Sequence, residues 1–483
     1  MTYTSTHPAP TPILSLAKPV ILDRLGIVTI LASLYYIQHF SHTAFYYEAD
    51  LLSARNIPAL GIWALGIAGI LLGRAHALLF ASALCMVLLY ALKAPSPSNS
   101  QIMAAFFSLI VVLSYAQWWL QGRAGGRDGL FDLIAGPGRW LLAIMYFYGI
   151  YHKINWDFLD PEVSCGAILY NYIMYPYPFD MANWTIGKYA AIYTTFIAEG
   201  IAMLLLFSSK YKKIGFIIGI PFHMAIGFSG YAYYLNFCTI VLVTYTLFIP
   251  RESMDNAKAW LVSIFGSEDV AAWIGRLFIV GGVVVTFGML GAFSDWHAIR
   301  TEQPTFKYAF AVYAALFYAF VVVFVPWRTN SDLPIFFIKP LWMMIIPIVF
   351  FINGASPYLG LKTESSIAMY SNLVTERGET NHLFHGVLPF GTTKYQEDIV
   401  IPDQATRQAM VKHFRQGGDA AVRFEFDRFL AKNPDKTFNF TYNGEARTND
   451  ATWENTYLNA SMLERRFLEF RAIEFGDKKL CTH

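Results

Sequence analysis

Long apolar runs, separated by short polar breaks, fill the first three quarters of the chain. A membrane-spanning helix needs about 20 mainly apolar residues, and eleven runs come near that length. The second and third are short enough to be a re-entrant pair, and Pro, Ser and Gly mark loops at 92–101 and 354–360. The pattern predicts helical spans at about 23–46, 59–73, 76–92, 101–120, 138–153, 187–208, 213–230, 233–250, 273–292, 308–327 and 336–353.

The pattern changes after residue 353. The last stretch holds sixteen Lys and Arg and seventeen Asp and Glu, as a solvated domain does. Alternating aromatics before Asn443-Gly444 predict a hairpin over 437–448. Helical spacing of Leu463, Phe467, Phe470 and Ile473 predicts a helix over 461–476. We therefore expect a short segment (1–22), an all-α polytopic membrane domain (23–353) and an α+β domain (354–483).

Composition supports a membrane protein. The 483 residues are 55% apolar and 14% charged, whereas soluble proteins carry roughly 25% charged residues. The net charge of +2 includes no long basic block, so we expect membrane lipid rather than nucleic acid as a partner. The first twenty residues lack the pattern of a cleavable signal peptide.

The distribution of basic residues predicts the orientation. With the N-terminus in the cytoplasm, inner loops and helix ends hold fourteen Lys and Arg, and outer ones hold six. The positive-inside rule favours this arrangement. An odd number of spans then puts the C-terminal domain outside the cell, and we expect a multi-pass protein of the plasma (inner) membrane.

Three ionisable residues within or at the ends of spans are candidates for chemistry. Lys153 closes the fifth predicted span, in "YFYGIYHKINWDFLDP". It is either an anchor that reaches the headgroups or a base in an apolar pocket. Glu199 lies deep in the sixth span and His223 in the seventh. Buried charges in membranes are costly and mark functional sites by default, although each could instead be bonded to a neighbouring helix.

Other polar or aromatic clusters carry weaker signals. His39 and His42 share a helix face, but no carboxylate stands at a firm ligand spacing, so we predict no metal site. The Tyr-rich stretch 170–180 is an interfacial aromatic belt or the lining of a site for a flat, quinone-like ligand.

The segment around Lys153 resembles the signature of the vitamin K-dependent gamma-carboxylase family, also called the horizontally transferred transmembrane (HTTM) domain. The matching residues are Lys153, Ile154, Asp157 and Phe158. "FIAEGIAMLLLF" places Glu199 at the family's acidic position, and "FHMAIGF" carries its Phe–His start. "LGLKTESSIAMYSNLVTERGETNHLF" is similar to the beginning of the family's lumenal domain.

The resemblance implies an enzyme in which Lys153 deprotonates reduced vitamin K or another lipid quinol. Oxygen then converts the quinol to a stronger base, which removes the γ-proton of a substrate glutamate before carbon dioxide adds. We assign Glu199 and His223 to the catalytic group beside Lys153. His152, Asp157, Asn372 and His382 are candidate substrate-binding residues, for a secreted peptide or protein; for the last two, domain packing is the alternative.

The chain departs from the family at one place. The carboxylase has a histidine that is hydrogen-bonded to its lysine. The corresponding stretch here contains Asn99, Ser100 and Gln101 and no histidine. His152 or His223 could substitute. Two other classes of function stay open: a non-catalytic maturation or export factor for a secreted peptide, and a transporter.

The predicted topology also suggests a disulfide. Cys165 follows Lys153 in an outer loop and Cys481 ends the outer domain, so both face the oxidising side. Cys85 and Cys238 lie within spans and are expected to be buried thiols.

Overall fold

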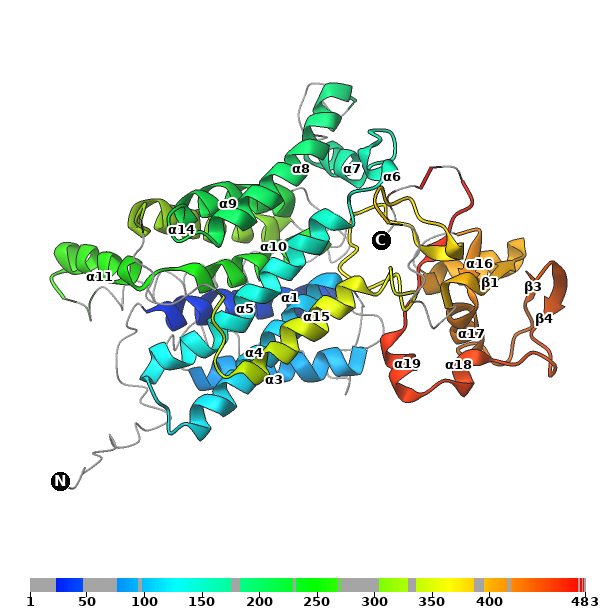
Figure 1. Ribbon diagram of the computed structural model, residues 1–483, viewed down its shortest axis with the longest axis horizontal. Coiled ribbons are helices and arrows are strands. Elements are labelled where there is room, and N and C mark those ends of the chain that lie inside the picture. Colours follow the sequence, from blue (N-terminus) through cyan, green and yellow to red (C-terminus); the bar gives the residue numbers. More distant parts are fainter. Residues whose placement is uncertain are drawn as a thin grey trace.

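The structure is a computed structural model, and Figure 1 shows the arrangement of its elements. It describes residues 23–46, 76–93, 98–174, 183–228, 232–267, 270, 304–328, 336–385, 395–414, 418–476, 478–479 and 481. The described part is mostly helical with one small antiparallel sheet, which agrees with the predicted combination of a helical domain and an α+β domain.

Within the described residues, nine helices formed by apolar runs make up most of the first part of the fold, and other helices and turns connect them. The long and apolar helices are α1 (Arg24–Tyr46), α3 (His76–Lys93), α4 (Asn99–Leu120), α5 (Gly126–Tyr151), α8 (Thr185–Leu206), α9 (Lys212–Phe228), α10 (Ala232–Tyr245), α14 (Pro304–Phe324) and α15 (Ile345–Ala355). The others are α6 (Trp156–Leu159), α7 (Cys165–Met174), α11 (Arg251–Phe265) and the 3-10 turns η1 (Thr246–Phe248) and η2 (Leu341–Met344).

Each of these nine helices overlaps one of the eleven predicted spans, although α5 begins twelve residues earlier than predicted and α15 nine residues later. The spans at 59–73 and 273–292 lie outside the described residues. Length and apolar composition nevertheless qualify fewer helices to cross a membrane. Within the described ranges, α4, α5 and α8 qualify, and the bent pair α10–α11 makes a fourth if it counts as one span. The prediction of about eleven spans is therefore not confirmed: within the described residues, α1, α3, α14 and α15 contribute only shorter apolar stretches.

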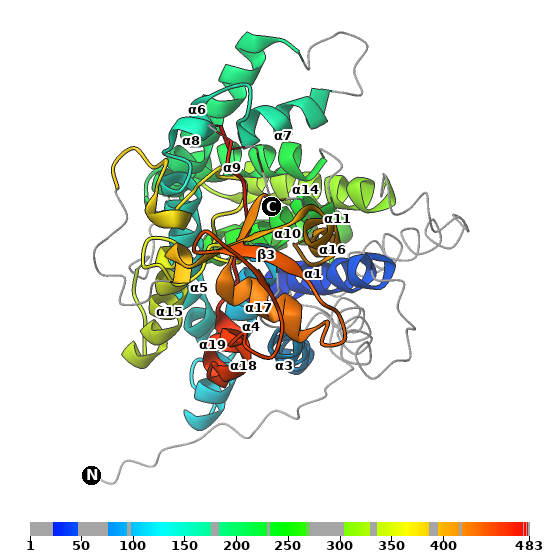
Figure 2. The same ribbon diagram turned by 90° about the vertical axis from the view of Figure 1, so that its right-hand side faces the viewer.

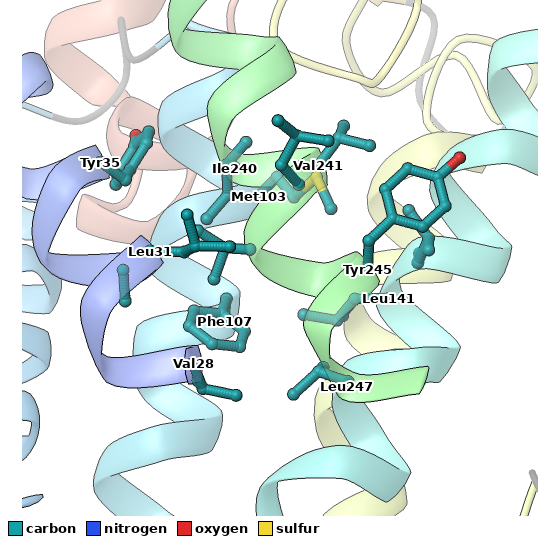
Figure 3. Close-up of a cluster of buried hydrophobic side chains, with 14 of the residues drawn as sticks. Val28, Leu31, Tyr35, Met103, Phe107, Leu141, Ile240, Val241, Tyr245 and Leu247 are labelled. Carbon is teal, nitrogen blue, oxygen red and sulfur yellow. The ribbon is translucent and has the colours of Figure 1, made fainter. Parts of the chain in front are cut away.

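The core of the helical part lies between α1, α4, α5 and α10. Figure 3 shows Leu31 of α1, Phe107 of α4 and Leu141 of α5 gathered around α10, which contributes Val241 to the same cluster. These side chains are nearly or completely buried. The close packing of such side chains stabilises this part of the fold through many small dispersion contacts.

Local sequence signals set several helix ends. Ser98 caps α4 in a capping box with Gln101, which satisfies two backbone N–H groups that the helix leaves free. α5 begins after Gly125, whose φ of 70° suits glycine. Asn155 caps α6 by accepting the N–H of Phe158 at 2.8 Å. Asn155 follows Lys153 by two residues, so this last cap ends the short segment that contains Lys153.

The C-terminal part contains a five-stranded sheet in the order β4-β3-β1-β2-β5, and all of its pairings are antiparallel. Two small apolar clusters pack in this part, one around Phe426 and one around Phe470. Its elements are η3 (Glu376–Gly378), η4 (Tyr395–Glu397), β1 (Ile399–Pro402), α16 (Gln404–Phe414), β2 (Ala420–Val422), α17 (Arg423–Ala431), β3 (Asn439–Tyr442), β4 (Glu445–Thr448), α18 (Thr456–Asn459), α19 (Met462–Phe467) and β5 (Ala472–Ile473).

One of the two local predictions for this part is confirmed. β3 and β4 form the predicted hairpin, and Asn443 and Gly444 take the positive φ values that its two-residue turn needs. The predicted helix over 461–476 is wrong beyond Phe467. There the backbone carbonyl of Glu469 accepts the N–H groups of Thr363 and Glu364, and β5 follows as a strand. Tertiary pairing overrides the helical spacing.

The two parts meet along the segment 356–385. In Figure 1 the long helices run toward the α/β part, and Figure 2 shows that part from its own side. The segment packs against the end of α5, where Leu383 donates its N–H to the carbonyl of Ile154 and Trp156 donates to that of Asn381. Residues just after the last long helix therefore belong to the wall around Lys153.

Candidate functional site

Lys153 lies just beyond the end of α5 and turns inward. Its Nζ lies 2.9 Å from both Oε1 and Oε2 of Glu199, on α8. The two residues are 7% and 6% exposed, and the ring of Phe158 lies 5.8 Å from Nζ. An anchor would reach outward and contact no other helix, so the geometry favours the interior placement that the sequence left open.

The pair lies on the wall of a cavity that is lined mainly by aromatic and aliphatic side chains and by methionines. The volume inside the cavity is about 70 Å³, which is room for a few water molecules. Helices α4, α5, α6, α7, α8, α9, α10 and α15 contribute, together with the segment after α15. The rings that line it belong to Tyr146, Phe158, Tyr234, Phe237, Phe350 and Tyr370.

His223 is buried but belongs to a separate network. Its Nε2 lies 2.7 Å from the hydroxyl of Tyr146, which lies 2.5 Å from the hydroxyl of Tyr245. Three helices, α9, α5 and α10, supply these groups. The structure thus brings Glu199 to Lys153 directly, whereas His223 reaches the cavity wall through Tyr146. Its predicted catalytic role remains a prediction.

His152 and Asp157 stabilise the turn that carries Lys153. The Nδ1 of His152 lies 2.9 Å from the hydroxyl of Tyr358, and the side chain is fully buried. Asp157 accepts a hydrogen bond of 2.7 Å from the amide of Asn381. Both side chains therefore face the segment after α15, and neither lines the cavity described above. Their contacts favour positioning of the turn over substrate binding.

Asn372 and His382 also hold backbone groups. Asn372 accepts the N–H of Cys165 at 2.8 Å and donates to the carbonyl of Val163 at 2.9 Å. His382 accepts the N–H of Phe384 through Nδ1, so its Nε2 carries the proton donated to the carbonyl of Tyr151. Burial lowers the pKa of His382, which keeps the ring neutral. These bonds agree with the domain-packing alternative.

The segment that closes the cavity has an unusual backbone. Ile367, Met369 and Tyr370 line the cavity, and five non-glycine residues between 365 and 377 have φ values of 54–68°. The left-handed region costs an L-residue roughly 1–2 kcal/mol. Such strain gathers at functional sites, where surrounding contacts hold it. The five residues are Ser365, Ile367, Tyr370, Asn372 and Arg377.

The predicted bridge between Cys165 and Cys481 is present. Cys165 begins α7 and also lines the cavity. The disulfide therefore ties the end of the chain to the cavity wall, and residues 316 positions apart become neighbours. Cys238 is buried as predicted, whereas Cys85 is half-buried.

The sequence did not indicate several cavity residues. Tyr146, Tyr234 and Tyr370 look like ordinary aromatic residues, because nothing local distinguishes a ring that faces a cavity from one in a core. Asn99, in the stretch that replaces the family histidine, lines the cavity and accepts the N–H of Ile367 at 2.8 Å. Nearby, Gln101 lies 3.4 Å from the Nε2 of His39, so a histidine from α1 approaches this stretch.

The contacts of Lys153 define what the site can do. An ammonium group has three N–H bonds, and Glu199 takes two of them, which leaves one for a ligand in the cavity. Within the described residues, no group of three or more His, Cys, Asp or Glu could hold a metal ion.

Comparisons with protein-family models, with curated proteins and with solved structures found no match.

Proposed function

We propose that this chain is a polytopic membrane enzyme of the gamma-carboxylase type, in which Lys153 acts as a base on a lipid-soluble quinol. The observation that carries the proposal is the buried Lys153–Glu199 pair on the wall of an aromatic cavity. Membrane-buried ionisable groups that face the bundle interior mark functional sites. The resemblance around Lys153, Asp157 and Phe158 adds the reaction class.

The lining of the cavity suits a flat apolar ring. Phe158 and the tyrosines on its wall offer faces and edges for stacking, and the free N–H of Lys153 offers one polar contact. When bound, a quinol would supply, with oxygen, the strong base needed to remove the γ-proton of a glutamate, to which carbon dioxide then adds. Lys153 would accept the quinol proton after passing its own extra proton to Glu199. The apolar wall excludes water from that exchange.

The membrane placement is part of the proposal. It comprises up to eleven spans, the N-terminus in the cytoplasm and the α/β part outside. Two features support this orientation. Arg24, Arg127 and Arg251 are grouped by ion pairs with Asp23 and Asp128 near the starts of α1, α5 and α11, as the positive-inside rule expects of a cytoplasmic face. The disulfide lies where the helical part meets the α/β part. Disulfides persist in oxidising compartments, which fits an α/β part outside the cytoplasm.

The test uses the full chain in lipid nanodiscs. Reduced naphthoquinone, oxygen, labelled bicarbonate and a glutamate-rich peptide are supplied, and label in the peptide is counted. Lys153→Arg should abolish incorporation, because a guanidinium does not act as a base near neutral pH. The matched control is Lys213→Arg, which changes a buried lysine that donates to the carbonyl of Val322 and does not line the cavity.

A second readout separates binding from turnover. A photoreactive naphthoquinone should label the wild type and Lys153→Arg alike, at residues of the cavity wall. Labelling without turnover in the wild type would favour a binding factor over an enzyme. Full turnover in a folded Lys153→Arg variant would refute the base role.

A further inference from the structure

α11 has a sharply divided surface. Met254, Ala257, Leu261 and Ile264 fall on one helical face, while the charged residues of its first two turns lie on the other. α11 leaves the bundle at 92° to the helix before it. In Figure 1 it extends at the end of the bundle farthest from the α/β part.

The apolar face is covered along half of its length. Ser253, Met254 and Ala257 are buried, and the ring of Trp260 lies 5.6 Å from that of Phe324 at the end of α14. Farther along the same face, Trp260 and Ile264 are 50% and 52% exposed. The face that packs on the protein therefore continues beyond it.

The surroundings indicate what covers the exposed half. α14 carries an exposed apolar face that ends at Val323, and Trp327 follows it, with Lys213 Nζ 4.6 Å from its ring. Tryptophans and lysines at helix ends are typical of the level where lipid headgroups begin. Trp260 contacts α14 one turn before Trp327, so the two indoles lie at the same end of this helix.

We propose that α11 is an interfacial helix, with Trp260 and Ile264 inserted among the lipids of the bilayer leaflet on the side away from the α/β part. An amphipathic helix perpendicular to its neighbours, with a tryptophan on the apolar face, fits the boundary between headgroups and acyl chains. The inference rests on the membrane placement proposed above and goes beyond it. It assigns a lipid contact to a helix that is not a span.

Spin labels test the contact directly. Cys85 and Cys238 are replaced by alanine, single cysteines are introduced at residue 264 or 255, and the full chain is reconstituted in phosphatidylcholine–phosphatidylglycerol vesicles. Collision of the label with oxygen, which gathers in the acyl region, is compared with collision with a water-soluble nickel chelate. The label at Ile264→Cys should collide more often with oxygen. The label at its matched control, Asp255→Cys on the charged face, should collide more often with the nickel chelate.

A third label separates two kinds of failure. Ile197 is 57% exposed on α8, so Ile197→Cys should report lipid if the bundle crosses the bilayer. Lipid contact at 197 with nickel access at 264 would overturn the α11 proposal alone. Shielding of 264 from both reagents would also overturn it, because another protein surface would cover the helix. Nickel access at 197 would instead refute the membrane placement.

Discussion

Breaking the Lys153–Glu199 pair should destabilise the protein strongly. Glu199→Leu removes both acceptors of Lys153, which is 7% exposed. An unpaired buried charge costs about 3–5 kcal/mol, because water is not there to solvate it. We expect Glu199→Leu to lower the free energy of unfolding by that amount.

The double variant shows whether the loss comes from the unpaired charge. Lys153→Met with Glu199→Leu replaces the pair by apolar side chains of similar length. Such replacements are often neutral or stabilising by about 1–4 kcal/mol, so the double variant should regain most of the stability that Glu199→Leu loses. It should also lack activity, which separates the role of the pair in chemistry from its role in folding.

The assay is reversible unfolding in mixed micelles, followed by circular dichroism, for the wild type, both single variants and the double variant. A large coupling between the two sites is the expected result. If Glu199→Leu costs less than about 1 kcal/mol, the pair behaves as an exposed surface ion pair. Water would then reach the cavity freely, and the apolar setting on which the base role depends would be refuted.

Three other predictions concern packing, covalent structure and pH. Gly354→Ala should cost about 1–3 kcal/mol by overpacking, since its Cβ would lie 2.2 Å from the ring of Tyr148. Gly200→Ala, whose Cβ would lie 3.5 Å from the side chain of Ile150, should be tolerated in the same melting assay. Cys481→Ser should lower stability by roughly 2–4 kcal/mol, and non-reducing peptide mapping of the wild type should recover the disulfide-linked pair. Burial raises the pKa of Glu469 from 4.5 to about 8. The folded protein therefore holds a proton that the unfolded chain releases, and the free energy of unfolding falls as pH rises from about 5 to 8. Glu469→Gln should flatten the decline in unfolding midpoint that the wild type shows over that window.

The sequence predicted the parts of the fold that depend on local pattern. Apolar runs located α4, α5 and α8, and Asn443-Gly444 located the hairpin. The pattern failed where distant backbone decides the outcome. Residues 468–473 have helical spacing of apolar side chains but pair with 363–364 and β2 instead. Similarly, the run at 233–250 gives no sign that the chain turns by 92° into α11.

The site was predictable to the extent that burial of charge is expensive. Lys153 and Glu199 stand out in apolar sequence, and each needs a partner, so their pairing follows from electrostatics. His223 was expected to need a partner too, but the sequence contains many hydroxyl and carboxyl groups and does not identify Tyr146. Asn372 looked like a substrate contact because polar residues near a cavity mouth can bind substrates. Its amide holds the start of α7, which agrees with domain packing, and the substrate role stays a prediction.

The placement of the segment 365–372 bears on how the two parts of the chain work together. The long helices alone do not complete the cavity, since Ile367, Met369 and Tyr370 lie in the segment that follows α15. Asn372 bonds the backbone at Cys165, whose disulfide holds the C-terminal end at the same wall. The α/β part therefore helps fix a strained backbone that forms one wall of the site. A division of the chain at residue 353 separates two units by composition, but it passes through the wall of the cavity that contains Lys153.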